Sequence, residues 1–152
     1  MLKYFQSLDK QEQLSINEKI NEIPYFFKED LSKRKFSNLN EIRKELHKKH
    51  EFMVVINNIG FISGVYENKR LHSITIVNFE KNNFKFMKGV LYFLGILETL
   101  PIEKVEFAVF EDLDIVLDMD KRLCDKFKLK LIKKHNEDGF IKFKYERRKN
   151  DI

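Results

Sequence analysis

The sequence has few of the residues that mark specialised classes of protein. Cys124 is its only cysteine, so no disulfide can form within the chain, and a reducing compartment is the expected setting. No apolar run approaches the roughly 20 residues that a membrane-spanning helix requires. The opening "MLKYFQSLDKQEQ" is polar after its first residues and has no signal-peptide core. We therefore expect a soluble, cytoplasmic protein without membrane contact.

Glycine, proline and alanine are also scarce. The 152 residues include five Gly, two Pro and a single alanine, Ala108, with no internal repeat and no Gly-, Ser- or Pro-rich linker. We therefore predict one domain over residues 1–152. Lys, Asn, Ile, Phe and Glu are abundant instead, which is typical of an AT-rich genome such as that of a low-GC bacterium, phage or plasmid.

Positive charge is concentrated late in the chain. The net charge is +5, and residues 121–149 hold twelve Lys and Arg against four Asp and Glu. Such a segment can contact nucleic acid, an acidic protein surface or a phosphorylated cofactor, or it can simply be a solvated surface. In "FIKFKYE", strand alternation predicts Lys142 and Lys144 on one face with Phe140, opposite the apolar residues between them.

The hydrophobic pattern predicts a short first strand at "LKYF", then two helices and then a series of strands. A helix begins after Asp9, a suitable N-cap, and ends at Pro24, and a second helix begins after Asn38 with Glu41 three residues later. Three apolar segments, "EFMVVIN", "FISGVY" and "LHSITIVN", are separated by the turn sequences "NNIG" and "ENKR". This spacing is typical of a three-stranded antiparallel meander.

The second half of the chain continues with alternating helices and strands. A long apolar helix is expected over residues 83–100, in which Gly89 and Gly95 indicate close packing on a sheet. "KVEFAVF" is apolar on both faces and predicts a central strand, "LDIVLDMDKRLCDKF" predicts a helix, and a final hairpin turns at Gly139. The expected order is β-α-α-β-β-β-α-β-α-β-β, an α/β fold with a mixed, mostly antiparallel sheet flanked by helices.

Three segments carry a family resemblance: "NNIGFISGVY", "SITIVNFEKNNFKFMKGVLYFL" and "KRLCDKFKLKLI". The first resembles a hairpin of the GNAT family, the GCN5-related N-acetyltransferases. The second resembles the family's strand, phosphate loop and helix, and the third its late helix and following strand. The resemblance covers most of the chain and implies a GNAT-like fold. It also implies an N-acyltransferase that acts on an amine, with acetyl-CoA or another acyl-CoA as cofactor.

The resemblance further implies where an acyl-CoA would bind. The main chain at the end of "SITIVN", at Ile76 and Val77, would bind pantetheine, and the start of the next helix would bind the pyrophosphate. The residues implied at that helix start are Asn83, Lys85, Lys88 and Gly89. The family's glycine positions, however, fall on Asn83, Lys85 and Met87, so side chains occupy that space. The two lysines can supply positive charge there, or they can solvate the exposed face of a core helix.

Three residues are candidates for acid–base chemistry. Glu106, inside the central strand, and Glu111, at its end, can act as the base that deprotonates an amine, although a carboxylate at a strand end commonly just faces solvent. Cys124 falls on the position of the family's late-helix tyrosine, which protonates the departing thiolate. A thiol can donate a proton, but a lone cysteine on a helix is more commonly a small buried hydrophobe.

No metal site is expected, because the four histidines are scattered and "HKKH" has no acidic or cysteine partner placed nearby. No P-loop, dinucleotide-binding or nucleophile-elbow motif occurs. Three functions stay open: acyl transfer to an amine, a catalytically silent GNAT-like module that binds a protein partner, and nucleic-acid binding through the cationic segment. We rank the third last, because no recognition helix or aromatic stacking motif accompanies the charge.

Overall fold

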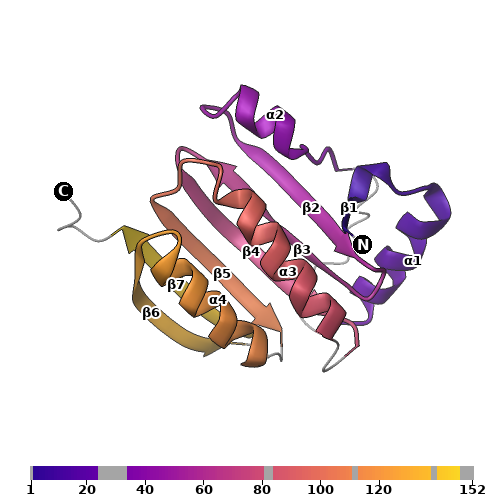
Figure 1. Ribbon diagram of the computed structural model, residues 1–152. Helices are drawn as coiled ribbons and strands as arrows, with labels where there is room; N and C mark the ends of the chain where they lie inside the picture. The colour runs from indigo at the N-terminus through magenta and orange to yellow at the C-terminus, as the bar shows by residue number, and fades with distance from the viewer. Residues whose placement is uncertain (1, 24–33, 81–83, 111–112, 138–139, 148–152) are drawn as a thin grey trace.

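Figure 1 shows the computed structural model, which describes residues 2–23, 34–80, 84–110, 113–137 and 140–147. The strands in this part of the chain are β1 (Leu2–Tyr4), β2 (His50–Ile56), β3 (Gly60–Glu67), β4 (Arg70–Asn78), β5 (Lys104–Phe110), β6 (Leu129–Glu137) and β7 (Phe140–Arg147). They form one sheet in the order β1-β2-β3-β4-β5-β7-β6. β4 and β5 are parallel, and the other neighbouring pairs are antiparallel. The predicted mixed, mostly antiparallel sheet is confirmed.

The described residues also form a 3-10 helix, Phe5–Ser7, and the helices α1 (Lys10–Asn21), α2 (Leu39–Lys44), α3 (Phe84–Leu97) and α4 (Leu113–Asp125). Both predicted N-caps are confirmed. The Asp9 carboxylate accepts a hydrogen bond from Glu12 N at 2.8 Å, and the Asn38 side chain accepts one from Glu41 N at 3.0 Å. These caps satisfy N–H groups that have no partner within the helix, and so they fix where α1 and α2 begin.

α3 is shorter than the helix predicted over residues 83–100. It ends at Leu97, and the chain leaves it through hydrogen bonds from Thr99 N to Ile96 O and from Leu100 N to Leu97 O. Pro101 prevents the helix from continuing, because it has no N–H to donate to Leu97 O and it disfavours the α conformation in Leu100.

Two tight turns join β2, β3 and β4 into the predicted meander. Asn57 and Asn58 turn between β2 and β3 with φ of 50° and 55°, and Asn68 and Lys69 turn between β3 and β4 with φ of 49° and 62°. Two consecutive left-handed residues are typical of a type I′ turn, whose twist matches that of the paired strands. Asparagine tolerates this conformation better than most residues. The turn sequences therefore set the register of the meander.

Different helices cover the two faces of the sheet, which we call the front face and the back face. α3 and α4 lie over the front face in Figure 1, where the larger core includes Phe93 of α3 and Tyr145 of β7. On the back face, Ile16 and Ile20 of α1 form a smaller core with residues such as Phe61 at one end of the sheet. The predicted central strand is confirmed, because β5 lies between β4 and β7. The rest of the back face carries polar and charged side chains, and these form the candidate site.

Two glycines of α3 have different neighbours. A Cβ atom at Gly89 would lie 2.5 Å from Ile56 Cγ2 of β2, so the predicted close packing on the sheet is confirmed there. A Cβ atom at Gly95 would instead lie 3.4 Å from Arg122 Nη1 of α4. The prediction is wrong for Gly95, because this side of α3 faces a second helix rather than the sheet.

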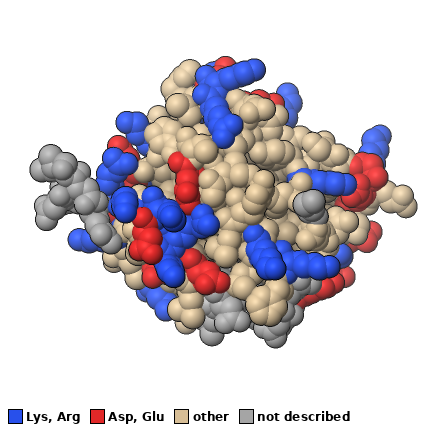
Figure 2. Space-filling model, viewed as in Figure 1, with Lys and Arg blue, Asp and Glu red and all other residues tan. Residues whose placement is uncertain are grey.

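The front surface is only partly charged. Figure 2 shows a largely uncharged centre on this side, with Lys, Arg, Asp and Glu around it. Large apolar side chains that stay exposed on α3 and α4 include Phe84, Tyr92 and Leu117. Among the described residues, no helix combines the length and the apolar character needed to span a membrane.

Candidate functional site: a hollow on the back of the sheet

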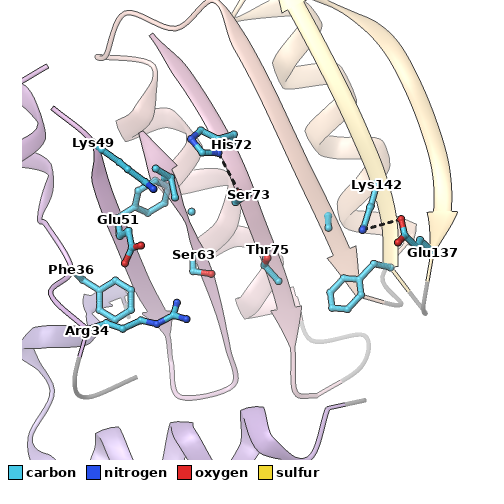
Figure 3. Close-up of a pocket in the computed structure, with 15 residues that line it drawn as sticks. Arg34, Phe36, Lys49, Glu51, Ser63, His72, Ser73, Thr75, Glu137 and Lys142 are labelled. Carbon is cyan, nitrogen blue, oxygen red and sulfur yellow. Dashed lines mark hydrogen bonds and ion pairs between the residues drawn. The ribbon is translucent and has the colours of Figure 1, made fainter. Parts of the chain in front are cut away.

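An open hollow lies on the back face, beyond the end that α1 covers. It consists of two adjoining depressions of about 490 and 480 Å³, which share Ser73, Thr75, Ala108 and Lys142. Figure 3 looks into the first depression, with side chains of β2, β3 and β4 on one side and Glu137 and Lys142 on the other. Volumes of this size suit a small molecule or a few side chains of a partner protein. We call both depressions together the back-face hollow.

One row of paired residues forms its floor. Ser63 pairs with Thr75, Thr75 with Ala108, and Ala108 with Lys142. Paired residues share a face of the sheet, so all four side chains are on the back face, whereas the neighbouring Ile76 is buried on the front. The floor therefore consists largely of hydroxyl groups and a methyl group, which leave space above the sheet.

A β-bulge in β4 adds another hydroxyl group. The register with β5 shifts by one residue between Leu71 and Ile74, and Ser73 has a left-handed φ of 53°. Its Oγ lies 3.2 Å from Nδ1 of His72, whose Nε2 lies 3.3 Å from a Glu67 carboxylate oxygen. Such a backbone conformation costs about 1–3 kcal/mol in a residue other than glycine. The strands on both sides of β4 hold it in place, and Ser73 lines the hollow as a result.

A second bulge, in β6, brings a lysine to the same hollow. Leu131 pairs with Tyr145, but the next pair joins Lys133 to Lys144. In a regular strand Ile132 would lie opposite Lys144, because the register advances one residue at a time on each strand. The bulge therefore substitutes a lysine for an isoleucine at the back face, and Lys133 lines the hollow together with Lys144.

Positive charge exceeds negative charge around the hollow. Five cationic and three anionic side chains line it, namely Arg34, Lys49, Lys133, Lys142, Lys144, Glu51, Glu106 and Glu137. Lys142 Nζ lies 3.0 Å from Glu137 Oε2. Hydrogen bonds from Lys142 and then from His135 hold the pKa of the Glu137 carboxyl below its usual value. Lys144 has a looser ion pair, at 3.8 Å, with Glu146.

Lys133 and Glu106 differ from these paired residues. Among the described residues, neither side chain has a hydrogen-bond or ion-pair partner. Lys133 is exposed, and Glu106 is half-buried on β5, where its strand partner is Lys144. The hollow therefore holds an unpaired cation on β6 and an unpaired carboxylate on β5, two strands that β7 separates, and both can accept a ligand.

The structure separates the predicted catalytic residues. Glu106 lies in the back-face hollow, but Cys124 is half-buried on α4 and packs against the larger core of the front face. Nearby, the Tyr145 hydroxyl donates a hydrogen bond to the Asp120 carboxylate. Glu111 lies outside the described residues. A base at Glu106 and an acid at Cys124 would therefore stand on opposite faces of the sheet.

The predicted coenzyme residues are placed as follows. Ile76 and Val77 have buried side chains, and their main chains pair with β3 on one side and with β5 on the other. Lys85 and Lys88 are exposed near the start of α3. Gly89 packs closely against Ile56 of β2. Asn83 lies outside the described residues. The two lysines are exposed to solvent, whereas the strand end has both edges paired.

The described part of the chain offers no metal centre beside the hollow. It contains no group of three or more His, Cys, Asp or Glu side chains arranged to hold a metal ion. Neither a family model nor a curated protein matches the sequence. The resemblance to the GNAT family therefore rests on the residues and segments alone.

Proposed function

We propose that this chain is a GNAT-like binding module that engages a protein partner and does not transfer acyl groups. The order of elements along the chain, β-α-α-β-β-β-α-β-α-β-β apart from the 3-10 helix, supports the GNAT-like fold. A hollow large enough for partner side chains supports the binding role.

The pairing of β4 on both of its edges is the main argument against acyl transfer. The resemblance assigns pantetheine to the main chain at Ile76 and Val77. On the β5 side, however, Ile76 pairs with Val109 and Val77 with Phe110, and on the β3 side they pair with Ile62 and Phe61. A strand with neighbours on both edges has no free row of N–H and C=O groups for a third partner. The residues present do not fit the coenzyme's arm without separation of β4 from β5.

Two further departures support the same proposal. The glycine positions of the phosphate loop fall on residues with side chains, among them Met87, which packs against the larger core. Cys124, at the position of the family's proton-donating tyrosine, stands on the other face of the sheet from Glu106. A single reaction centre cannot use two groups that the sheet separates.

Calorimetric titration with acetyl-CoA, paired with an assay for released thiol in the presence of primary amines, tests this proposal. We expect no saturable binding and no thiol release. Saturable binding together with amine-dependent thiol release would overturn it.

Acyl transfer remains a second candidate because of Glu106. An unpaired carboxylate in an open hollow can remove a proton from an amine, and an acyl-CoA would supply the activated acyl group. In this case Glu106→Gln should abolish turnover. Replacement of Lys85 and Lys88 by Ala should weaken coenzyme binding at least severalfold with little change in Tm, since both are exposed. Turnover that persists in Glu106→Gln would remove Glu106 as the base.

A further inference from the structure

We infer that the back-face hollow is a seat for an acidic segment of a partner protein, whose carboxylates bind at the Lys133–Lys144 pair. This inference rests on the proposed binding role and adds the place and the chemistry of the contact. Three observations support the inference: the placement of two bulges, the pairing of the lysines and the charges around them.

Both bulges place a polar side chain in the same hollow. The bulge in β4 places Ser73 there and the bulge in β6 places Lys133 there, although the two strands are separated by β5 and β7. Bulges commonly re-aim a side chain at a functional position. In β6 the outcome is a lysine where regular pairing would give Ile132. Two independent irregularities therefore each bring a polar group to one open surface.

The Lys133–Lys144 pair is unfavourable without a ligand. Side chains directly opposite each other on antiparallel strands have Cβ atoms about 4.5–5.5 Å apart, and like charges at this separation repel. Lys142 follows on the same face of β7, about 7 Å along the strand. Of these three lysines, only Lys142 has a close carboxylate, at 3.0 Å, whereas Lys144 has one at 3.8 Å and Lys133 has none among the described residues. A carboxylate bound between Lys133 and Lys144 would relieve their repulsion.

The surroundings favour an acidic protein over a nucleic acid. Glu106, Glu137 and Glu146 lie among the lysines on the same face of the sheet, and they would repel a chain of evenly spaced phosphates. Phe140 and Phe143 are buried, so they do not offer a stacking surface for bases. A protein segment can instead alternate carboxylates with main-chain N–H and hydroxyl donors, and Glu106 and the hydroxyl groups of Ser73 and Thr75 can accept hydrogen bonds from these.

Fluorescence anisotropy with a labelled oligoglutamate peptide, at low salt and with the full chain, tests the inference. The decisive variant replaces Lys133 and Lys144 by Gln. Its matched control replaces Lys121 and Lys126 by Gln, which removes the same charge from exposed positions at the end of α4. We expect the first variant to lose about tenfold in affinity, within the range for two exposed ion pairs. The control should lose less than about twofold, since only long-range attraction changes.

Further measurements separate the alternatives. Glu106→Gln should strengthen oligoglutamate binding, because it removes a repelling charge, and an oligoglutamine peptide of the same length should bind much more weakly. Unchanged melting temperatures in the two lysine variants would show that both remain folded, since exposed lysines contribute little to stability.

Four results would overturn the inference: no oligoglutamate binding at low salt, equal losses in the two lysine variants, equal binding of oligoglutamine, or tighter binding of a single-stranded oligonucleotide with the same dependence on Lys133 and Lys144. The last result would assign the surface to nucleic acid. Failure of this inference can be distinguished from failure of the proposed function. Amine-dependent thiol release from acetyl-CoA would refute the proposed function, whereas the oligoglutamate measurements test only the acidic-segment site.

Discussion

Replacement by alanine should stabilise the protein at Gly95 but not at Gly89, although both residues lie in α3. Within a helix, alanine is favoured over glycine by about 1 kcal/mol. At Gly95 the new methyl group would meet only the end of the Arg122 side chain, at 3.4 Å. This side chain can move, so Gly95→Ala should gain about the full 1 kcal/mol in the free energy of unfolding.

At Gly89 the new methyl group would lie 2.5 Å from Ile56 Cγ2, and Ile56 is fully buried in β2. Overpacking of a core costs about 1–3 kcal/mol, which outweighs or cancels the helix gain. Gly89→Ala should therefore lie between no change and a loss of about 2 kcal/mol. The two variants should differ by about 1–3 kcal/mol, or about 2–12 °C in Tm for a chain of this size.

Urea unfolding of both variants, followed by circular dichroism, measures this difference. Ile56→Ala provides a second check, because it removes the atom that the new methyl group would meet. In that background Gly89→Ala should become stabilising, since the methyl group then fills part of a cavity. The reasoning is refuted if Gly89→Ala stabilises the parent as much as Gly95→Ala does, or if its effect is the same in both backgrounds.

Three further predictions concern other residues in the core or packed against it. Burial, and then the hydrogen bond to Asp120, raise the pKa of Tyr145. The unfolded chain therefore loses this proton first, and the free energy of unfolding falls as the pH rises beyond about 10. Urea unfolding at several pH values should show a shallower fall in Tyr145→Phe than in the parent, and equal slopes in the two proteins would contradict the assignment. Gly60→Ala should cost more than about 2 kcal/mol, because its Cβ would overlap Phe86 and a β4 main-chain carbonyl oxygen; a loss below about 1 kcal/mol in the same assay would count against this packing. Cys124 should react with a thiol reagent more slowly than a cysteine placed at an exposed α4 position, since it packs against the larger core; equal rates in the folded protein would show an accessible thiol.

The sequence predicts the local structure well because the responsible side chains act on their own neighbourhood. Asp9 and Asn38 cap the helices that follow them, and Asn57 and Asn58 turn the first hairpin in the conformation that asparagine tolerates. Such signals lie within a few residues of their effect. Alternation in the last strand likewise places Lys142 on the back face of the sheet, as predicted.

The hollow could not be predicted in the same way, because it depends on strand order and on two irregularities of register. Glu106 and Lys144 are far apart in the sequence and become partners only because β7 lies beside β5. The bulge in β6 cannot be read from "LKLIKKH", since residues 130–137 are exposed on both faces and carry no alternating pattern. Ser73 has a left-handed φ without a glycine or asparagine to signal it. Lys133 and Ser73 were therefore missed, whereas Glu106 was found as a polar residue in an apolar strand.

The strand order also bears on how the chain folds during its synthesis. Translation proceeds from the N-terminus, so β6 leaves the ribosome before β7, although β7 lies between β6 and β5 in the finished sheet. Until β7 emerges, β6 has no partner in the sheet. Leu131 and Ile132, still 42% and 47% exposed in the folded chain, then face solvent or a chaperone. The surrounding lysines discourage pairing with the strands of other nascent chains during this interval. The hairpin of β6 and β7 is then expected to form first and to dock onto β5 as one unit, so that the charged back surface is completed in the last step.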